Sequence, residues 1–192
     1  MPTIVHGFDW PDRVVVGTIG SPGSRSFYLQ ARTGPRVVSV ALEKEQSALL
    51  ARGIDEILDD LRATDGNPAN VPELTPVELI DDAPLDQPVE PEFRVGAMTL
   101  GWDPSTVQIV IEVYPLVDVE QGDPDDDGLV VDLDAAAALE PAEMVSIRIP
   151  VGTARAFTKR TLEVVGAGRP LCPLCGAPMD PDGHVCGRPD DL

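Results

Sequence analysis

The sequence predicts an α+β fold, in which an antiparallel sheet is built from two strand–strand–strand–helix units and a short cysteine-containing tail follows. Three strand-like segments and one amphipathic helix succeed one another twice along the 192 residues. Short, turn-rich links between the strands imply antiparallel pairing within each unit. Val95-Gly96 in the second half corresponds to Val16-Gly17 in the first. The halves therefore represent either an internal duplication or two weakly similar segments that match by chance.

The first unit covers residues 1–62. Its strands are expected at 13–20, 26–32 and 36–42, which are rich in β-branched and aromatic residues and are separated by the turn sequences GSPGS and TGP. Residues 43–61 are expected to form a helix, because apolar residues recur there at three- and four-residue spacings. Gly53 lies inside this helix at a cost of about 1 kcal/mol relative to Ala, which a close helix–sheet contact would explain. The residues before Arg13 are expected to form a turn.

The second unit covers residues 93–168, with strands expected at 93–102, 105–115 and 144–150 and a helix at 151–168. An acidic insert at 116–143 separates its second and third strands. Residues 63–92 join the two units and contain six prolines, which exclude a long helix or a central strand. We expect this segment to be an extended, acidic connector.

Negative charge is concentrated in these two segments. The net charge is −19, of which residues 63–92 and 116–143 contribute −18, since they contain eight and ten acidic residues and no Lys or Arg. Such an excess repels phosphate groups. It therefore argues against nonspecific binding to DNA or to anionic lipid.

The chain shows no sign of membrane insertion or export. No run approaches the roughly 20 apolar residues that cross a bilayer, and the first residues lack the basic start and apolar core of a secretory signal. We therefore expect a cytoplasmic protein, in which cysteines remain reduced and bind a metal more readily than they form disulfides.

All three cysteines lie in the tail, residues 169–192. Cys172 and Cys175 are separated by two residues and followed by Gly176, and His184 and Cys186 complete a set of four ligands. A Cys₃His set is a closed tetrahedral zinc site, which is structural rather than hydrolytic. So short a segment cannot build its own core, so the metal would supply its folding energy. Metal-free cysteines and redox chemistry are the alternatives.

The stretches FYLQAR, VSVALEKEQ and CPLCGAPMDPDGHVC together resemble an actinobacterial family of uncharacterised proteins, classified as a domain of unknown function. The resemblance covers most of the chain. It implies a zinc-ribbon-like C-terminal end with the pattern CPLCG…GHxC, and it implies no activity.

Two further patterns resemble functional motifs. Residues 123–134 place acids at calcium-loop spacing, although the sequence lacks the final Glu and the preceding helix of such a site, and a solvated acidic loop is the competing interpretation; the candidate ligands are Asp123, Asp125, Asp127 and Asp134. His6 with Asp9 and Asp12 nearby has the composition of a general base. No nucleophile motif accompanies it, and a turn is the preferred interpretation.

The basic residues of the second unit form one cluster in the sequence, Arg148, Arg155, Lys159 and Arg160. Arg155 and Lys159 are one helical turn apart and share a face. The cluster either binds a phosphate-bearing ligand or RNA, or it neutralises the acidic segments of the same chain.

Three functions follow from these patterns. The leading hypothesis is a noncatalytic cytoplasmic binding or adaptor protein, whose structural zinc tail contacts a protein partner. The alternative is an enzyme or ligand-binding protein that accepts a phosphorylated metabolite in a cleft between the two halves. The third is an RNA-binding ribbon protein, which the overall negative charge disfavours. The sequence identifies no catalytic residue.

Overall fold

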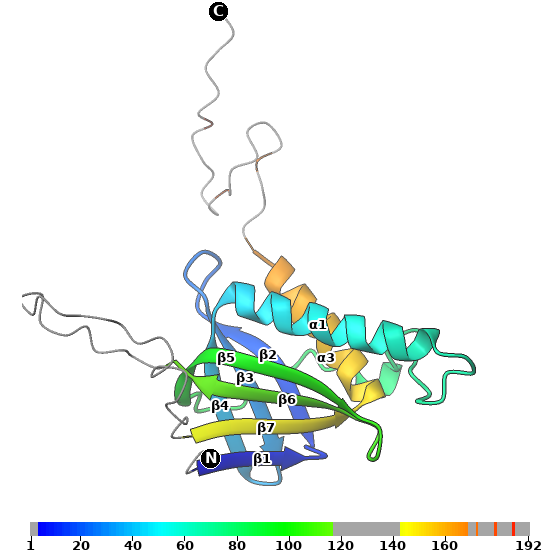
Figure 1. Ribbon diagram of the computed structural model, residues 1–192. Coiled ribbons are helices and arrows are strands. Elements are labelled where there is room, and N and C mark those ends of the chain that lie inside the picture. Colours follow the sequence, from blue (N-terminus) through cyan, green and yellow to red (C-terminus); the bar gives the residue numbers. More distant parts are fainter. Residues whose placement is uncertain (1–3, 117–142, 169–171, 173–178, 180–185, 187–192) are drawn as a thin grey trace, which may run out of the picture.

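The computed structural model describes residues 4–116 and 143–168, together with Cys172, Met179 and Cys186. In chain order its elements are β1 (Ile4–Asp9), β2 (Arg13–Ile19), β3 (Ser26–Thr33), β4 (Arg36–Leu42), α1 (Lys44–Ala63), the short 3-10 helix η1 (Val77–Leu79), β5 (Pro91–Asp103), β6 (Gln108–Pro115), β7 (Glu143–Pro150) and α3 (Val151–Gly166) (Figure 1). The order of three strands and one helix occurs twice, as β2–β3–β4–α1 and β5–β6–β7–α3.

The seven strands form one mixed sheet in the order β1-β7-β6-β5-β4-β3-β2. Neighbours within each three-strand group are antiparallel, as the short turns predict. The expectation of a wholly antiparallel sheet is wrong at two places, because β4 pairs with β5 and β1 pairs with β7 in parallel. Between β4 and β5 the chain passes through α1, and a helical crossover of this kind produces parallel neighbours.

Strand β1 was expected to be a turn, and this expectation is wrong. Its partner β7 begins at residue 143. No turn or hairpin pattern near β1 in the sequence therefore indicates the pairing. Burial along β1 is uneven, with Phe8 buried and both Ile4 and Val5 exposed. The segment therefore lacks the regular apolar alternation by which the other strands are recognisable.

The sheet curves so strongly that its two edges approach each other (Figure 1). Strands β1 and β2 are consecutive in the chain but lie at opposite ends of the strand order. The four Cα–Cα steps from Asp9 to Arg13 reach at most roughly 14 Å. Arg36 at the start of β4 bridges to β1: its Nη1 donates a hydrogen bond to the Gly7 carbonyl at 3.0 Å, and its guanidinium lies 4.5 Å from the centre of the Phe8 ring.

Helices α1 and α3 pack against each other and cover the same side of the sheet (Figure 1). A single apolar core fills the space between these two helices and the sheet. It contains buried Ile54 and Leu58 of α1, Phe157 of α3, and Ile111 and Ile147 of the sheet. No described helix combines the length and apolar character needed to cross a membrane.

Gly53 explains how α1 comes so close to the sheet. A Cβ atom at this position would lie 2.8 Å from Cδ1 of Leu100 on β5, which is shorter than a van der Waals contact. The close helix–sheet contact expected from the sequence is confirmed.

The segment between α1 and β5 is held to the rest of the protein by two arginines. Arg13 of β2 donates from Nε and Nη2 to the Asp81 carboxylate at 2.6 and 3.1 Å. Arg160 of α3 donates to the same carboxylate at 3.1 Å and to the Asp81 and Ala83 carbonyls. Leu85 is buried against β2, where Gly17 leaves room for its side chain. Asp81 thus joins β2, α3 and the connecting segment.

Candidate functional site

A cleft with a volume of about 410 Å³ lies where the two strand–strand–strand–helix units meet. The parallel pairing of β4 with β5, with Ser39 opposite Pro91 and Ala41 opposite Arg94, places the start of the second unit beside the end of β4 and the start of α1. The lining residues come from both units: Arg25, Ser26, Phe27, Tyr28, Ala41, Leu42, Glu43, Lys44, Pro91, Phe93 and Arg94.

Positive charge predominates in this cleft, in contrast to the acidic chain as a whole. Three cations line it, and Glu43 is its one acidic side chain. Arg94 donates to Glu43 Oε1 at 2.5 Å, and Arg25 donates to the Ala167 carbonyl at 2.6 Å. Lys44 has no hydrogen-bond or ion-pair partner within the part of the chain that the structure describes.

Aromatic rings provide the apolar part of the same cleft. Tyr28 and Phe93 are half-buried, and Phe27 is buried. Rings beside cations suit a ligand that has a flat or apolar portion and a negatively charged portion. The cleft differs in this respect from a second cavity of about 330 Å³, where Arg13, Asp81 and Arg160 satisfy one another.

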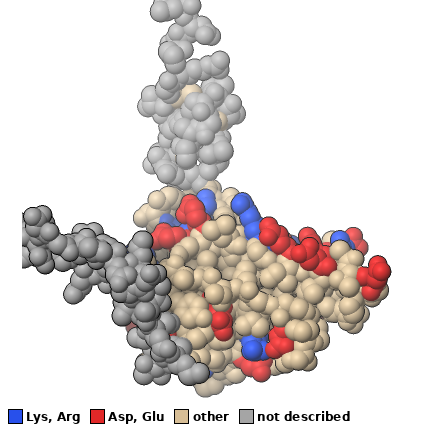
Figure 2. All heavy atoms as spheres, viewed as in Figure 1, with Lys and Arg blue, Asp and Glu red and all other residues tan. Residues whose placement is uncertain are grey.

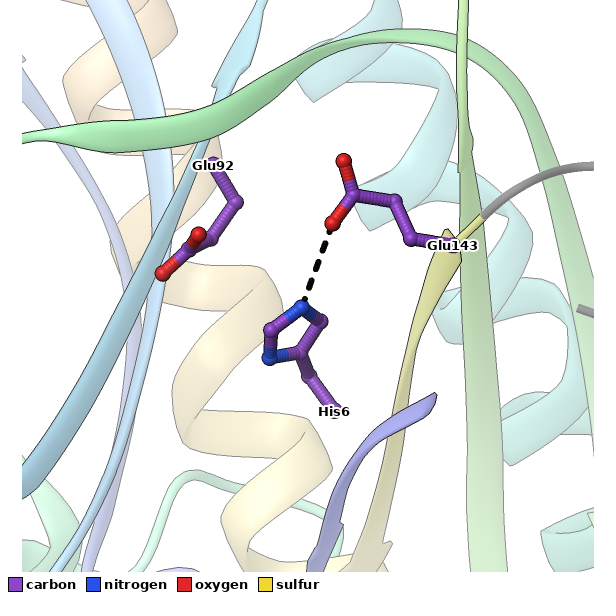
Figure 3. Close-up of side chains that lie close together, drawn as sticks. All are labelled: His6, Glu92 and Glu143. Atoms are coloured by element: carbon purple, nitrogen blue, oxygen red, sulfur yellow. Dashed lines mark hydrogen bonds and ion pairs between the residues drawn. The ribbon is translucent and has the colours of Figure 1, made fainter. Parts of the chain in front are cut away.

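A second group of functional side chains lies near one end of β1 and β7. His6, Glu92 and Glu143 point toward one another, and their ligand atoms all lie within 4.8 Å (Figure 3). The Nε2 atom of His6 is 3.3 Å from Oε2 of Glu143. In the structure His6 thus lies beside two glutamates that the sequence analysis did not single out.

The aspartates expected near His6 have other partners. Asp9 accepts a hydrogen bond from Gln108 Nε2 at 2.9 Å. Asp12 accepts one from the Gly34 amide at 2.6 Å. Among the described residues no hydrogen bond or ion pair joins either carboxylate to His6, so the structure does not bring these three together.

The four cations singled out in the sequence face separate carboxylates. Arg155 donates to Asp55 and Asp59 on α1 at 2.8 and 2.9 Å. The others pair as follows: Arg148 with Asp103, Lys159 with Glu163, and Arg160 with Asp81. On the face shown in Figure 2, Lys and Arg lie beside Asp and Glu, and the described residues form no basic patch there. An anion-binding role for these four stays a prediction.

Much of the sequence-predicted metal chemistry lies outside the described residues. Of the four expected zinc ligands, the structure describes Cys172, which is buried, and Cys186, which is partly exposed. Cys175 and His184 lie outside the described residues. The same holds for the four expected calcium ligands, Asp123, Asp125, Asp127 and Asp134. Zinc and calcium binding stay predictions.

The cations of the cleft were missed because they are widely spaced in the sequence. Lys44 and Arg94 are 50 residues apart in the sequence, and Arg25 precedes Lys44 by 19 residues. The β3–β4 pairing, with Phe27 opposite Leu42, brings the residues before β3 beside the start of α1, and the β4–β5 pairing adds Arg94. The one local indication of the cleft was the pair of charged residues at the start of the helix, Glu43 and Lys44. Such a pair is also common at helix ends that face solvent, so it did not identify a site.

Comparison with known proteins identifies a family and no activity. Residues 6–186 match a family described as "Protein of unknown function (DUF3090)". No curated protein and no solved structure matches the chain. Since the matched region extends over most of the 192 residues, the chain belongs to this family of proteins of unknown function.

Proposed function

We propose that this protein binds an anionic small molecule, a metabolite that carries a phosphate group, in the cleft between its two strand–strand–strand–helix units. The observation that carries the proposal is Lys44, which lines the cleft beside Arg25 and Arg94 and has no partner among the described residues. An ammonium group is a strong donor to phosphate oxygens. A guanidinium adds directed hydrogen bonds to the same group.

The size and composition of the cleft support a small ligand. Its volume of about 410 Å³ falls in the range of roughly 300–1,000 Å³ that is typical of ligand pockets. Tyr28 and Phe93 would contact the flat or apolar part of the ligand. Among the described residues that line the cleft there is no His, Cys or Asp, and Glu43 is held by Arg94. We therefore propose that the cleft binds a ligand, and we assign no reaction to it.

Replacement of Lys44 tests this proposal. We expect Lys44→Ala to weaken the binding of AMP, used as a probe, by about tenfold, because a lost charge-assisted hydrogen bond costs roughly 1.5–3 kcal/mol. Isothermal titration calorimetry measures the change. Arg52→Ala is the matched control, since Arg52 also lies exposed on α1 and has no partner among the described residues, yet does not line the cleft.

Inorganic phosphate should compete with AMP if the cleft recognises AMP mainly through its phosphate group. The proposal fails if Lys44→Ala and Arg52→Ala bind AMP as the unaltered protein does. It also fails if neither AMP nor inorganic phosphate binds.

We propose as a second function that the tail is a structural zinc ribbon through which the protein contacts a protein partner. The Cys₃His spacing supports it. The matched family region ends at residue 186, and the four expected ligands lie within it: Cys172, Cys175, His184 and Cys186. The tail therefore belongs to the family domain rather than following it.

Native mass spectrometry of protein purified without chelator tests the zinc ribbon. We expect the unaltered protein to carry one zinc ion more than Cys172→Ser does, while the melting transition of the core stays nearly unchanged, because the Cys₂His set left in the variant no longer closes the tetrahedron. Met179→Ala, within the same segment, is the control. A protein that carries no zinc, or a Cys172→Ser variant that carries as many zinc ions as the unaltered protein, contradicts this proposal.

A further inference from the structure

Three strands bring His6, Glu92 and Glu143 together. His6 lies on β1, Glu143 is the first residue of β7, and Glu92 lies at the start of β5. In the parallel β1–β7 register His6 is opposite Val145, so both side chains point to the same face of the sheet. Glu143 precedes Val145 by two residues and shares that face. Because Val145 is buried in the core, His6 and Glu143 point inward.

The three side chains converge, and His6 and Glu143 are at hydrogen-bond distance. The imidazole of His6 and the two carboxylates face one another around a common space (Figure 3). All the ligand atoms lie within 4.8 Å of one another, and the His6–Glu143 pair is separated by 3.3 Å. The side chains of His6 and Glu143 are 17% and 25% exposed, so their charges are only partly screened by water.

The electrostatics of the group call for a cation. Two carboxylates so close to each other are repulsive when both are ionised. Within the described residues neither Glu92 nor Glu143 has an Arg or Lys partner, and the one ion pair is with His6. Even a charged imidazole leaves the group with a net negative charge. A divalent cation would compensate both carboxylates at once.

We propose that His6, Glu92 and Glu143 bind one divalent transition-metal ion of the Mn²⁺, Fe²⁺ or Zn²⁺ class. The donor set decides the class, because carboxylates suit hard cations and an imidazole nitrogen favours first-row transition metals over Ca²⁺ and Mg²⁺. Bonds of about 2.0–2.2 Å require the ligand atoms to draw closer. Glu92 is exposed and is free to rotate toward the other two ligands.

Such a site is chemically distinct from the cysteine set of the tail. Three protein ligands leave coordination positions open to water or to a substrate, as in catalytic metal sites. A closed Cys₃His set leaves none. The proposal depends neither on the phosphate cleft nor on the zinc ribbon.

Mn²⁺ is the probe of choice, because it prefers oxygen and nitrogen donors and the thiolates of the tail compete for it weakly. Titration of the full chain, followed by the loss of the free Mn²⁺ signal in electron paramagnetic resonance, should show one saturable site. Glu92→Gln and Glu143→Gln should each weaken binding at least tenfold. Glu90→Gln is the matched control, since Glu90 is exposed and lies just before the cluster on the same segment.

Thermal stability provides a second measurement that a folding defect does not imitate. Mn²⁺ should raise the melting temperature of the unaltered protein and of Glu90→Gln, because a ligand that binds only the folded state stabilises it. It should not raise that of Glu92→Gln, whose exposed side chain contributes little to folding. Saturable Mn²⁺ binding that survives in both Glu92→Gln and Glu143→Gln, or its absence from the unaltered protein, overturns the proposal.

Discussion

Asp81→Asn should lower the free energy of unfolding by about 2–3 kcal/mol, because it removes the shared charge partner of two mostly buried arginines. The side chains of Arg13 and Arg160 are 10% and 12% exposed, and Asp81 is 30% exposed. The amide keeps one acceptor oxygen but presents an NH₂ group where Arg13 donates. Urea denaturation followed by circular dichroism measures the loss.

The neighbouring residue provides the control for charge alone. Asp82 is exposed and has no hydrogen bond or ion pair within the described residues, so Asp82→Asn should change stability by no more than about 0.5 kcal/mol. Equal losses in the two variants would show that net charge, rather than the bridge between β2, α3 and the connector, determines the effect.

The same bridge predicts a dependence on pH. The hydrogen bond from Arg13 lowers the pKa of Asp81 below its ordinary value. A carboxyl whose pKa is lower in the folded state adds stability above its unfolded pKa of about 3.9 and loses this contribution as the pH falls through the folded value. The stability difference between the unaltered protein and Asp81→Asn should therefore be largest near neutral pH and should shrink below about pH 4.

Local patterns were sufficient for the strands and helices of the two units. The period-two alternation of residues such as Ile109 and Ile111, and the turns between strands, are properties of neighbouring residues, and β2 to β4 and β6 to β7 lie close to the expected ranges. Strand β1 was not predicted, because its partner β7 is far away in the sequence. Long-range pairing leaves no trace in a short window of sequence.

The candidate sites depend on the two pairings that the sequence analysis did not foresee. The cleft lies at the parallel β4–β5 pairing, where Ala41 is opposite Arg94. The His6 cluster lies at the parallel β1–β7 pairing, where Ile4 is opposite Glu143. Antiparallel hairpins are predictable from their turns, whereas the register of a parallel pair is set by tertiary packing. Sequence reasoning therefore recovered the units but not the places where they meet.

The glycines of the Val-Gly repeat, Gly17 and Gly96, leave room for different neighbours, and this difference is the basis of the last prediction. A Cβ at Gly17 would lie 2.6 Å from Leu85 Cγ, at the end of a side chain that can rotate. A Cβ at Gly96 would lie 2.6 Å from the Cα of Leu116 and 3.0 Å from its nitrogen. That nitrogen donates to the Arg94 carbonyl at 2.7 Å, so relief requires the end of the β5–β6 ladder to open.

Gly96→Ala should therefore cost about 2 kcal/mol and Gly17→Ala about 1 kcal/mol, since overpacking against backbone is relieved less easily than overpacking against a side chain. Gly101→Ala on the same strand should be neutral or stabilising, because a Cβ there meets its nearest neighbour, Val110, at 3.9 Å. Urea unfolding of the three variants gives the order. If Gly96→Ala lowers the free energy of unfolding no more than Gly101→Ala does, the end of the β5–β6 ladder moves freely. Gly96 is then no more constrained by its neighbours than Gly17 is.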